Sequence, residues 1–314
     1  MKIVFFGTGA FGLPTLQRIC GSGDFSVSAI VTGPDQPQGR GRKLSPSAIA
    51  AWAESESIGP ILKPVSVRDP DLPDRLRSLN ADLFLVVAYR ILPEAIYTIP
   101  PVAINLHASL LPRYRGAAPI QRAIMAGETR TGVTTFVLQK TVDTGGILLQ
   151  RELAIAPEEN AGELSRRLAL IGAEVVVETL RGVRDGTLKP QAQDASLASP
   201  APKILPADRV IDFAVPADAI VDRVRGLAPK PAAVTMFREK LIKILALRNT
   251  NQASDASPGT IVAADARAGL KISAGGNILD VVRVQPEGRS EQTGPEFVRG
   301  QRIKPGERFE RAAL

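Results

Sequence analysis

The sequence predicts an α/β protein in which a doubly wound, mostly parallel sheet is followed by a small β-barrel or sandwich. Three observations lead to this prediction. Strand-like apolar runs alternate with helical patterns through residues 1–188, as expected for strands joined by helical crossovers. Residues 189–207 are rich in Pro, Ala and Ser and are typical of a linker. Residues 208–314 hold short strand-like runs separated by turn residues, which is typical of a small all-β domain.

The spacing of apolar residues predicts the individual elements. Residues 2–7, KIVFFG, form an apolar run that ends in Gly, and Leu13, Leu16 and Ile19 then recur at helical spacing. Residues 162–183 carry apolar side chains along one face of a long helix. The remaining predictions before the linker are strands 26–32, 82–89, 103–107 and 132–139 and helices 48–55 and 119–127; after it they are strands 210–213, 232–237, 240–247, 259–265, 269–273 and 278–286.

The composition excludes several classes of protein. Cys20 is the one cysteine and cannot form an internal disulfide, and with a single histidine as well we expect no metal site. No apolar run approaches the roughly 20 residues of a membrane helix. The N-terminal run passes straight into a Gly-rich turn, without the cleavage site of a signal peptide. We therefore expect a soluble, cytoplasmic protein and, because no extended apolar surface helix is evident, a monomer.

The net charge of +7 is concentrated in the second half of the chain. Residues 1–200 hold 21 Lys and Arg against 19 Asp and Glu, whereas residues 201–314 hold 18 against 13. A basic second half favours a polyanionic partner such as a nucleic acid. Alternatively, the positive charge of this chain reflects an organism whose proteins are basic in general.

The stretch GTGAFG, from Gly7 to Gly12, fits the dinucleotide-binding pattern G-x-G-x-x-G between a strand and a helix. Asp35 lies about twenty residues on, roughly where a ribose-binding acid would lie. However, Pro14 follows at once, and Asp35 lies in a turn beyond the end of the next strand. We favour a tight turn that needs small residues over a nucleotide site.

The one histidine, His107, ends a predicted strand, and Asn105 lies two residues before it on the same face. Ligands bind at the carboxyl ends of strands in open α/β sheets. Asp143 follows the next strand in a Gly-flanked loop. The stretch around Asp143, LQKTVDTGGILLQ, holds no Ser or Cys to partner this set, which favours direct transfer to an incoming nucleophile over a covalent intermediate. The alternatives are a structural histidine, a strand-end amide that holds a loop, and a turn-capping aspartate.

The turn SLLP, residues 109–112, follows the histidine after one residue, Ala108. We expect its free backbone groups to hold the hydrogen-bonding edge of a planar heterocycle.

Two stretches together resemble the signature of the folate-dependent formyltransferases: NLHASLLPRYRGAAPIQRAI at 105–124 and VDTGGILL at 142–149. The likeness extends over nearly the whole chain, through FFGT, PDQPQGRGRKLSPS, KPVSVRD, DLFLVVAYRILP and the β-rich second domain. It implies a Rossmann-like catalytic domain that binds no nucleotide, over residues 1–188. It also implies a linker at 189–207 and an OB-like C-terminal β-barrel that binds tRNA, over residues 208–314.

The resemblance also implies an activity and the residues that support it. The activity is transfer of a formyl group from the co-substrate 10-formyltetrahydrofolate, without a metal, to the amino group of methionyl initiator tRNA. Its implied catalytic residues are Asn105 and His107, which would stabilise the oxyanion, and Asp143, which would hold the imidazole or a bridging water. The implied folate-contacting residues are Ser109, Leu110, Leu111, Pro112, Val87 and Tyr89, and the implied tRNA-contacting residues are Arg40, Arg42 and Lys43.

The chain departs from the usual residues of the family outside this catalytic set, at Gly9, Ala10, Arg90, Thr141, Val142 and Lys230. Two other functions stay open on the residues alone. One is a formyltransferase that acts on a small amine such as an amino sugar, which would need neither a basic loop nor a basic second domain. The other is a noncatalytic nucleotide- or RNA-binding protein, which would leave the single histidine unexplained.

Overall fold

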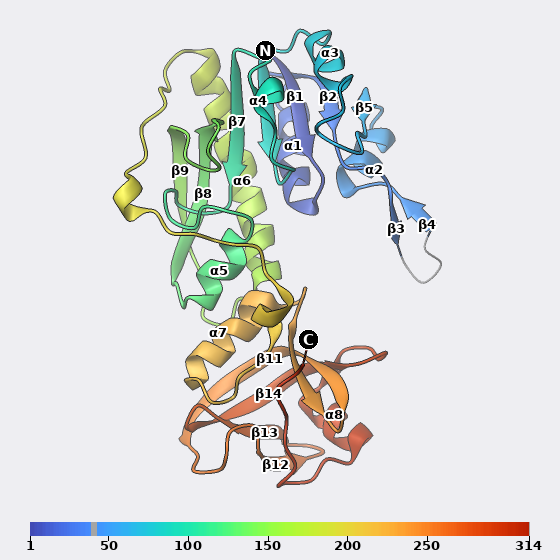
Figure 1. Cartoon of the computed structure of the whole chain (residues 1–314), viewed down its shortest axis with the longest axis vertical. Coiled ribbons are helices and arrows are strands. Elements are labelled where there is room, and N and C mark those ends of the chain that lie inside the picture. Colours follow the sequence, from blue (N-terminus) through green and yellow to red (C-terminus); the bar gives the residue numbers. More distant parts are fainter. Residues whose placement is uncertain (39–42, 314) are drawn as a thin grey trace. The chain divides into compact units, whose positions relative to one another are not determined.

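The computed structural model of the chain describes residues 1–38 and 43–313, which form two compact units (Figure 1). The first unit consists of Met1–Ala117, Arg130–Ala154 and Ser165–Ala201; the second consists of Ala118–Thr129, Ile155–Leu164 and Pro202–Leu314. The second unit thus includes two short segments that lie before the predicted linker. The domain limits given by the sequence, 1–188, 189–207 and 208–314, stay a prediction.

The first unit is built on a seven-stranded sheet in the order β5-β2-β1-β6-β7-β8-β9. Its strands are β1 (Lys2–Gly7), β2 (Ser26–Val31), β5 (Ile61–Leu62), β6 (Leu83–Val87), β7 (Val102–His107), β8 (Arg130–Val137) and β9 (Ile147–Ala154). The strands from β5 to β7 are parallel, whereas β8 and β9 run antiparallel. The predicted mostly parallel sheet is confirmed. A separate hairpin pairs β3 (Gln36–Gln38) with β4 (Lys43–Ser45).

Helices cover both faces of this sheet, as a doubly wound fold requires (Figure 1). They are α1 (Leu13–Gly21), α2 (Ala48–Ser55), α3 (Leu72–Arg77), α4 (Glu94–Tyr97) and α6 (Ala161–Arg184), with short 3-10 turns at η1 (Ala10–Gly12) and η2 (Ala195–Leu197). Val4 and Phe6 of β1 pack on one face with residues of α3 and α4. The other face packs on α2 and α6: a Cβ at Gly172 of α6 would come within 2.7 Å of the Leu106 side chain.

The GTGAFG stretch has a packing explanation. A Cβ at Gly7 would lie 2.7 Å from Cδ1 of Ile49 and from a ring carbon of Phe5. Asp35 is engaged by Lys63, whose Nζ lies 2.8 Å from its carboxylate. The close contacts at Gly7 agree with a turn at the end of β1 that needs a small residue.

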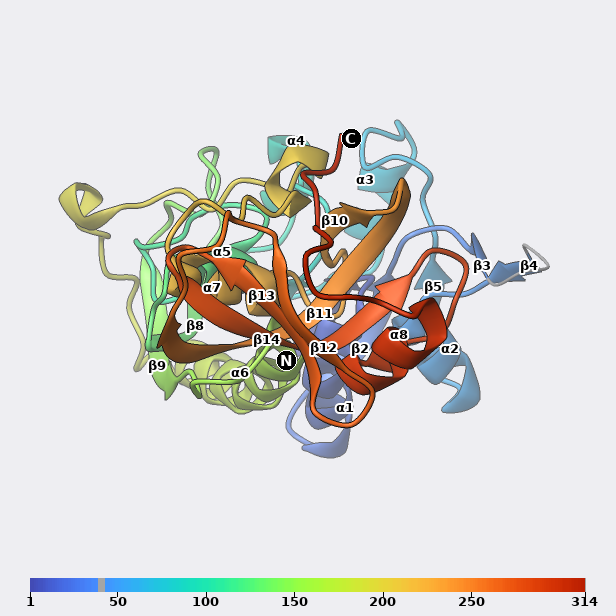
Figure 2. The same ribbon diagram turned by 90° about the horizontal axis from the view of Figure 1, so that it is seen from below.

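The second unit carries an antiparallel sheet in the order β10-β11-β14-β13-β12, whose five strands are labelled in Figure 2. A further short strand, β15, pairs with β14. The elements of this unit are α5 (Pro119–Met125), η3 (Pro206–Arg209), α7 (Ala217–Leu227), β10 (Ala233–Phe237), β11 (Lys240–Ala253), β12 (Ile261–Asp265), β13 (Gly269–Ala274), β14 (Asn277–Pro286), β15 (Gln292–Thr293) and α8 (Gly294–Gln301). α7 packs on β11 and on α5, and α8 packs on β12, β13 and β14. α7 and α8 were not predicted, because each is short and lies among strand-like runs.

The C-terminal segment closes this sheet into the predicted small barrel. Glu310 exchanges backbone hydrogen bonds of 2.9 Å with Met236 of the edge strand β10. Phe309 donates a 2.9 Å hydrogen bond to the carbonyl of Gly259, just before the other edge strand. The predicted strand at 210–213 is wrong: it makes a single bridge, between Val210 and Val234.

Candidate active site

β7 carries two of the predicted site residues to the carboxyl edge of the parallel strands. Asn105 lies opposite Val86 of β6 and Phe136 of β8, and His107 ends the strand. Because side chains alternate along a strand, both share the face of Ala103, which packs in the core cluster with α3 and α4. The shared face that the sequence predicts is therefore present.

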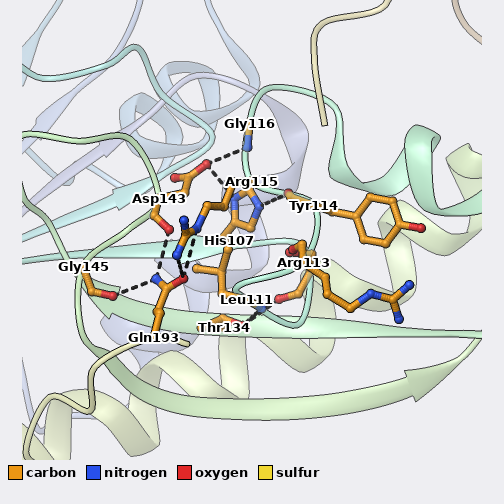
Figure 3. Close-up of polar contacts among 11 residues, drawn as sticks. His107, Leu111, Arg113, Tyr114, Arg115, Gly116, Thr134, Asp143, Gly145 and Gln193 are labelled. Carbon is orange, nitrogen blue, oxygen red and sulfur yellow. Dashed lines mark hydrogen bonds and ion pairs between the residues drawn. The ribbon is translucent and has the colours of Figure 1, made fainter. Parts of the chain in front are cut away.

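His107 is held in one orientation by the loop that follows it. The ring is buried, with 6% of the residue exposed. Its Nε2 lies 2.8 Å from the carbonyl oxygen of Tyr114 (Figure 3). A carbonyl only accepts hydrogen bonds, so Nε2 carries the proton and donates it. Nδ1 is then the ring nitrogen through which a proton can be gained or lost.

Asp143 lies on the Nδ1 side of that ring. Its Oδ2 is 3.7 Å from Nδ1 of His107 and accepts a 2.8 Å hydrogen bond from the backbone N–H of Gly116 (Figure 3). The residue has a left-handed backbone, with φ of 55°. The 3.7 Å separation suits an ion pair and exceeds a direct hydrogen bond. Both side chains are largely buried, at 7% and 12% exposed, so water screens this pair little.

The Asn105 side chain is half-buried and makes no hydrogen bond to any residue that the structure describes. Its amide keeps two N–H donors and one carbonyl acceptor available. The strand therefore presents two side chains on one face. The His107 ring is hydrogen-bonded through Nε2, whereas the Asn105 amide has no hydrogen-bond partner among the described residues.

The turn at residues 109–112 is fixed by the two antiparallel strands beside it. Thr134 of β8 accepts a 3.1 Å hydrogen bond from the N–H of Leu111 and donates one of 2.6 Å to the carbonyl of Ser109. Gln150 of β9 donates to the carbonyl of Leu111 at 2.8 Å. The backbone groups of Leu111 are thus already paired, rather than free as the sequence suggested. Ser109 and Leu111 are buried, and Leu110 and Pro112 are half-buried.

Two further predicted folate contacts lie at the end of the neighbouring strand. Val87 ends β6 and is fully buried, and its register partner on β7 is Leu106. Tyr89 follows two residues later. Its hydroxyl is buried without a hydrogen-bond partner in the described part of the chain. Burial raises the pKa of this phenol, because water no longer solvates the phenolate.

Two of the three predicted tRNA contacts lie outside the residues that the structure describes. Arg40 and Arg42 lie outside the described residues, and Lys43 begins β4. Within residues 1–38 and 43–313, no group of three or more His, Cys, Asp and Glu side chains is arranged to hold a metal ion. None of the helices over the same residues has both the length and the apolar character of a membrane span.

Comparison with known proteins identifies the family. Residues 1–180 match the formyl transferase family, and residues 203–302 match the formyl transferase C-terminal domain. A methionyl-tRNA formyltransferase of Solibacter usitatus is 42% identical over 311 residues, which cover 98% of each chain. The chain belongs to the methionyl-tRNA formyltransferase family.

Solved structures share the fold of this family member at low identity. The methionyl-tRNA formyltransferase of Clostridium thermocellum superposes with a TM-score of 0.56 at 15% identity, over 80% of this chain and 94% of that one. A Helicobacter canadensis N-formyltransferase in complex with folinic acid and dTDP-3-aminofucose gives 0.68 at 16%, over 91% and 99%. At such identities the likeness concerns the fold alone.

Sequence reasoning missed the polar residues that brace the site of this family member. Thr134 lies on β8, which pairs with β7, and Gln150 lies on β9, which pairs with β8. Gln193 and Ser199 lie in the segment interpreted as a linker. Gln193 is 50 residues from Asp143, whose backbone carbonyl it contacts. No local pattern signals such a contact; only the position of Arg115, inside the RGAAPIQ motif, could have drawn attention to it.

Proposed function

We propose that this chain transfers the formyl group of 10-formyltetrahydrofolate to the α-amino group of methionyl initiator tRNA, giving N-formylmethionyl-tRNA. One observation carries the proposal: a buried His107–Asp143 pair stands beside the uncommitted amide of Asn105 at the carboxyl edge of the sheet. This arrangement suits an acyl transfer that needs an oxyanion donor and a proton relay but no covalent nucleophile.

The substrates supply the two reacting atoms. An α-amine has a pKa near 8 in model compounds, so an appreciable neutral fraction exists at neutral pH. The 10-formyltetrahydrofolate supplies the formyl carbon. A bond forms between the amine nitrogen and this carbon, and the bond from the carbon to N10 of the folate breaks. One proton leaves the amine and one reaches N10, so the reaction needs a proton carrier and no oxidant or reductant.

Asn105 donates an amide N–H to the formyl oxygen as negative charge develops there. One such donor is typically worth about 3 kcal/mol of barrier. Because Nε2 of His107 is committed to the Tyr114 carbonyl, the second donor is its Nδ1–H. Asp143 lies 3.7 Å from this nitrogen and balances the charge of the imidazolium. A water held by its carboxylate takes the proton that leaves the amine and passes one to N10 of the folate.

The folate would lie along the ends of β6 and β7. The buried, unpartnered hydroxyl of Tyr89 is the kind of polar atom that a bound ligand satisfies. The turn at 109–112 is cross-braced by Thr134 and Gln150, so it supplies a rigid wall rather than a set of free backbone groups. Val87, Tyr89 and residues 109–112 remain our proposed folate contacts on this basis.

The acceptor is a polyanion, and the chain is basic. Arg40, Arg42 and Lys43 are the proposed tRNA contacts, and residues 201–314 carry 18 Lys and Arg against 13 Asp and Glu. Two relatives, 42% and 39% identical to this chain, are named methionyl-tRNA formyltransferase. We place the reaction in the cytoplasm, where initiator tRNA is charged and used.

The test is transfer of labelled formyl from 10-formyltetrahydrofolate to charged initiator tRNA, beside a panel of amino-sugar nucleotides. The unaltered chain and His107→Ala run in parallel. Formylated methionyl-tRNA from the unaltered chain alone supports both the acceptor and the role of His107. Transfer to a sugar and not to tRNA would keep the chemistry and overturn the acceptor. No transfer to any acceptor would favour a noncatalytic binding protein.

A further inference from the structure

A segment interpreted as a linker runs back across the site. We call residues 193–201 the strap. Arg115 donates its backbone N–H to the carbonyl of Ser199 at 2.9 Å, and Ala201 donates to the carbonyl of Arg115 at 2.6 Å. The Ser199 hydroxyl accepts a 2.9 Å hydrogen bond from the N–H of Tyr114. The strap therefore pairs with the loop that contacts both members of the His107–Asp143 pair.

Gln193 joins this strap to the other side of the site (Figure 3). Its Nε2 donates to the carbonyls of Asp143 and Gly145, at 2.9 and 2.8 Å. Its Oε1 accepts from Nε and Nη2 of Arg115, at 3.1 and 2.7 Å. A primary amide has two donors and two acceptor lone pairs, so the hydrogen-bonding capacity of this side chain is filled.

These four hydrogen bonds tie together the two loops that define the pair. The loop around Arg115 supplies the Tyr114 carbonyl that orients His107 and the Gly116 N–H that binds the Asp143 carboxylate. The loop at Asp143 supplies the carboxylate itself, from a residue with φ of 55°. Fixing one loop against the other fixes the distance between Nδ1 and Oδ2.

We infer that Gln193 is a positioning residue for the proposed formyl transfer, acting through Asp143 and Arg115 rather than by contact with substrate. The inference rests on the proposed function. Misplacement of catalytic groups by about 1 Å can cost on the order of 100-fold in rate. Loss of one brace, with the three strap hydrogen bonds to Tyr114 and Arg115 retained, is expected to lower kcat about 10-fold.

The experiment compares Gln193→Met with Gln191→Met in the full chain. Methionine keeps the length of the side chain and removes its hydrogen bonds. Gln191 is a matched control: it belongs to the same chain segment and is exposed, and its side chain makes no hydrogen bond to a described residue. Its backbone hydrogen bonds with Ile147 do not depend on the side chain. We expect Gln191→Met to keep the kcat of the unaltered chain.

The kinetic readouts separate positioning from stability. Below the unfolding transition, Gln193→Met should lower kcat about 10-fold, change KM for either substrate by less than about twofold, and displace the pH profile of kcat. Gln193→Glu supplies a second variant: it keeps the acceptor for Arg115 but loses both donors to the loop carbonyls. It should lose at least as much activity. A merely structural role would lower the melting temperature and leave kcat and its pH profile unchanged.

A double substitution shows whether Gln193 acts through Asp143. In an Asp143→Asn background, Gln193→Met should cause less than a twofold further loss, because residues that act as a unit are not additive. A full 10-fold further loss would overturn the inference, as would kcat within twofold of the unaltered chain for Gln193→Met and Gln193→Glu. If the unaltered chain transferred no formyl group, the proposed function would fail, and the positioning role with it.

Discussion

The candidate catalytic edge of the first unit, which carries His107 and Asp143, and the barrel of the second unit are stabilised by different forces. At this edge the nearby Tyr114 carbonyl holds His107, and hydrogen bonds from Gly116 and Gln193, 27 and 50 residues away in sequence, hold Asp143 in a buried, polar setting. The barrel instead has an apolar core. In it the centre of the Phe237 ring lies 6.0 Å from that of Phe297 and 5.3 Å from that of Phe309.

This difference predicts how each region responds to substitution. Polar bracing fixes geometry, and each bond adds little net stability. An apolar core adds stability in proportion to buried area and tolerates small shifts. Substitutions at the catalytic edge should therefore change rate more than stability, whereas substitutions in the barrel should change stability more than rate.

Asp143→Asn should have the largest effect, a fall in kcat of about 100- to 1000-fold. The amide keeps an acceptor for the Gly116 N–H but cannot take up a proton or balance a charged imidazole. The melting temperature should change little. Single-turnover formylation of methionyl-tRNA measures the chemical step directly. Turnover close to normal would show that Asp143 plays no part in the relay.

Phe309→Ala should destabilise the second unit by about 3–5 kcal/mol, the usual cost of truncating a buried Phe. Trp52 is the one tryptophan and lies in α2 of the first unit, so its fluorescence reports that unit. In urea, the midpoint followed by circular dichroism should fall while the fluorescence midpoint stays. An equal fall in both would mean that the units unfold together and would remove the contrast.

Replacing Arg40, Arg42 and Lys43 together by Ala should raise the apparent KM for tRNA about 10-fold. Each lost phosphate contact reduces the slope of log affinity against log salt by about 0.7 to 0.9. KM for 10-formyltetrahydrofolate and kcat should not change, because these residues are not proposed to touch the folate. Steady-state kinetics at three salt concentrations give both quantities. An unchanged KM for tRNA would remove the loop from the proposal.

Asp208→Asn should have the smallest effect, a loss of about 1 kcal/mol or less at neutral pH. Hydrogen bonds from Arg122 hold the pKa of Asp208 below its usual value. A carboxyl whose pKa is lowered on folding stabilises the fold above its unfolded pKa, and this contribution is lost as pH falls through the folded pKa. Urea unfolding at pH 7 and near pH 3 should show that the difference in free energy of unfolding between Asp208→Asn and the unaltered chain is smaller in acid. A difference that persisted in acid would exclude the ion pair as its cause.

Most of the fold followed from local patterns. The apolar run of residues 2–7 became β1, the helical spacing after it became α1, and 48–55 became α2, because alternation and helical periodicity report burial directly. The short amphipathic helices α7 and α8 were not predicted, since a helix of two or three turns among strand-like runs has too little periodic signal. The strand at 210–213 was wrong because an apolar run alone does not supply a pairing partner.

The sequence by itself predicted the type of candidate site. The Asn-x-His spacing on one strand, the Gly-flanked Asp143 and the following turn together specify which chemical groups meet, because strand alternation and the carboxyl-edge rule are local and general. Tertiary structure alone decided how these groups are held. The tautomer of His107 depends on the Tyr114 carbonyl, and the Asp143 loop depends on Gln193, 50 residues away. Such hydrogen bonds arise only after the chain has folded back on itself, because their partners share no sequence period.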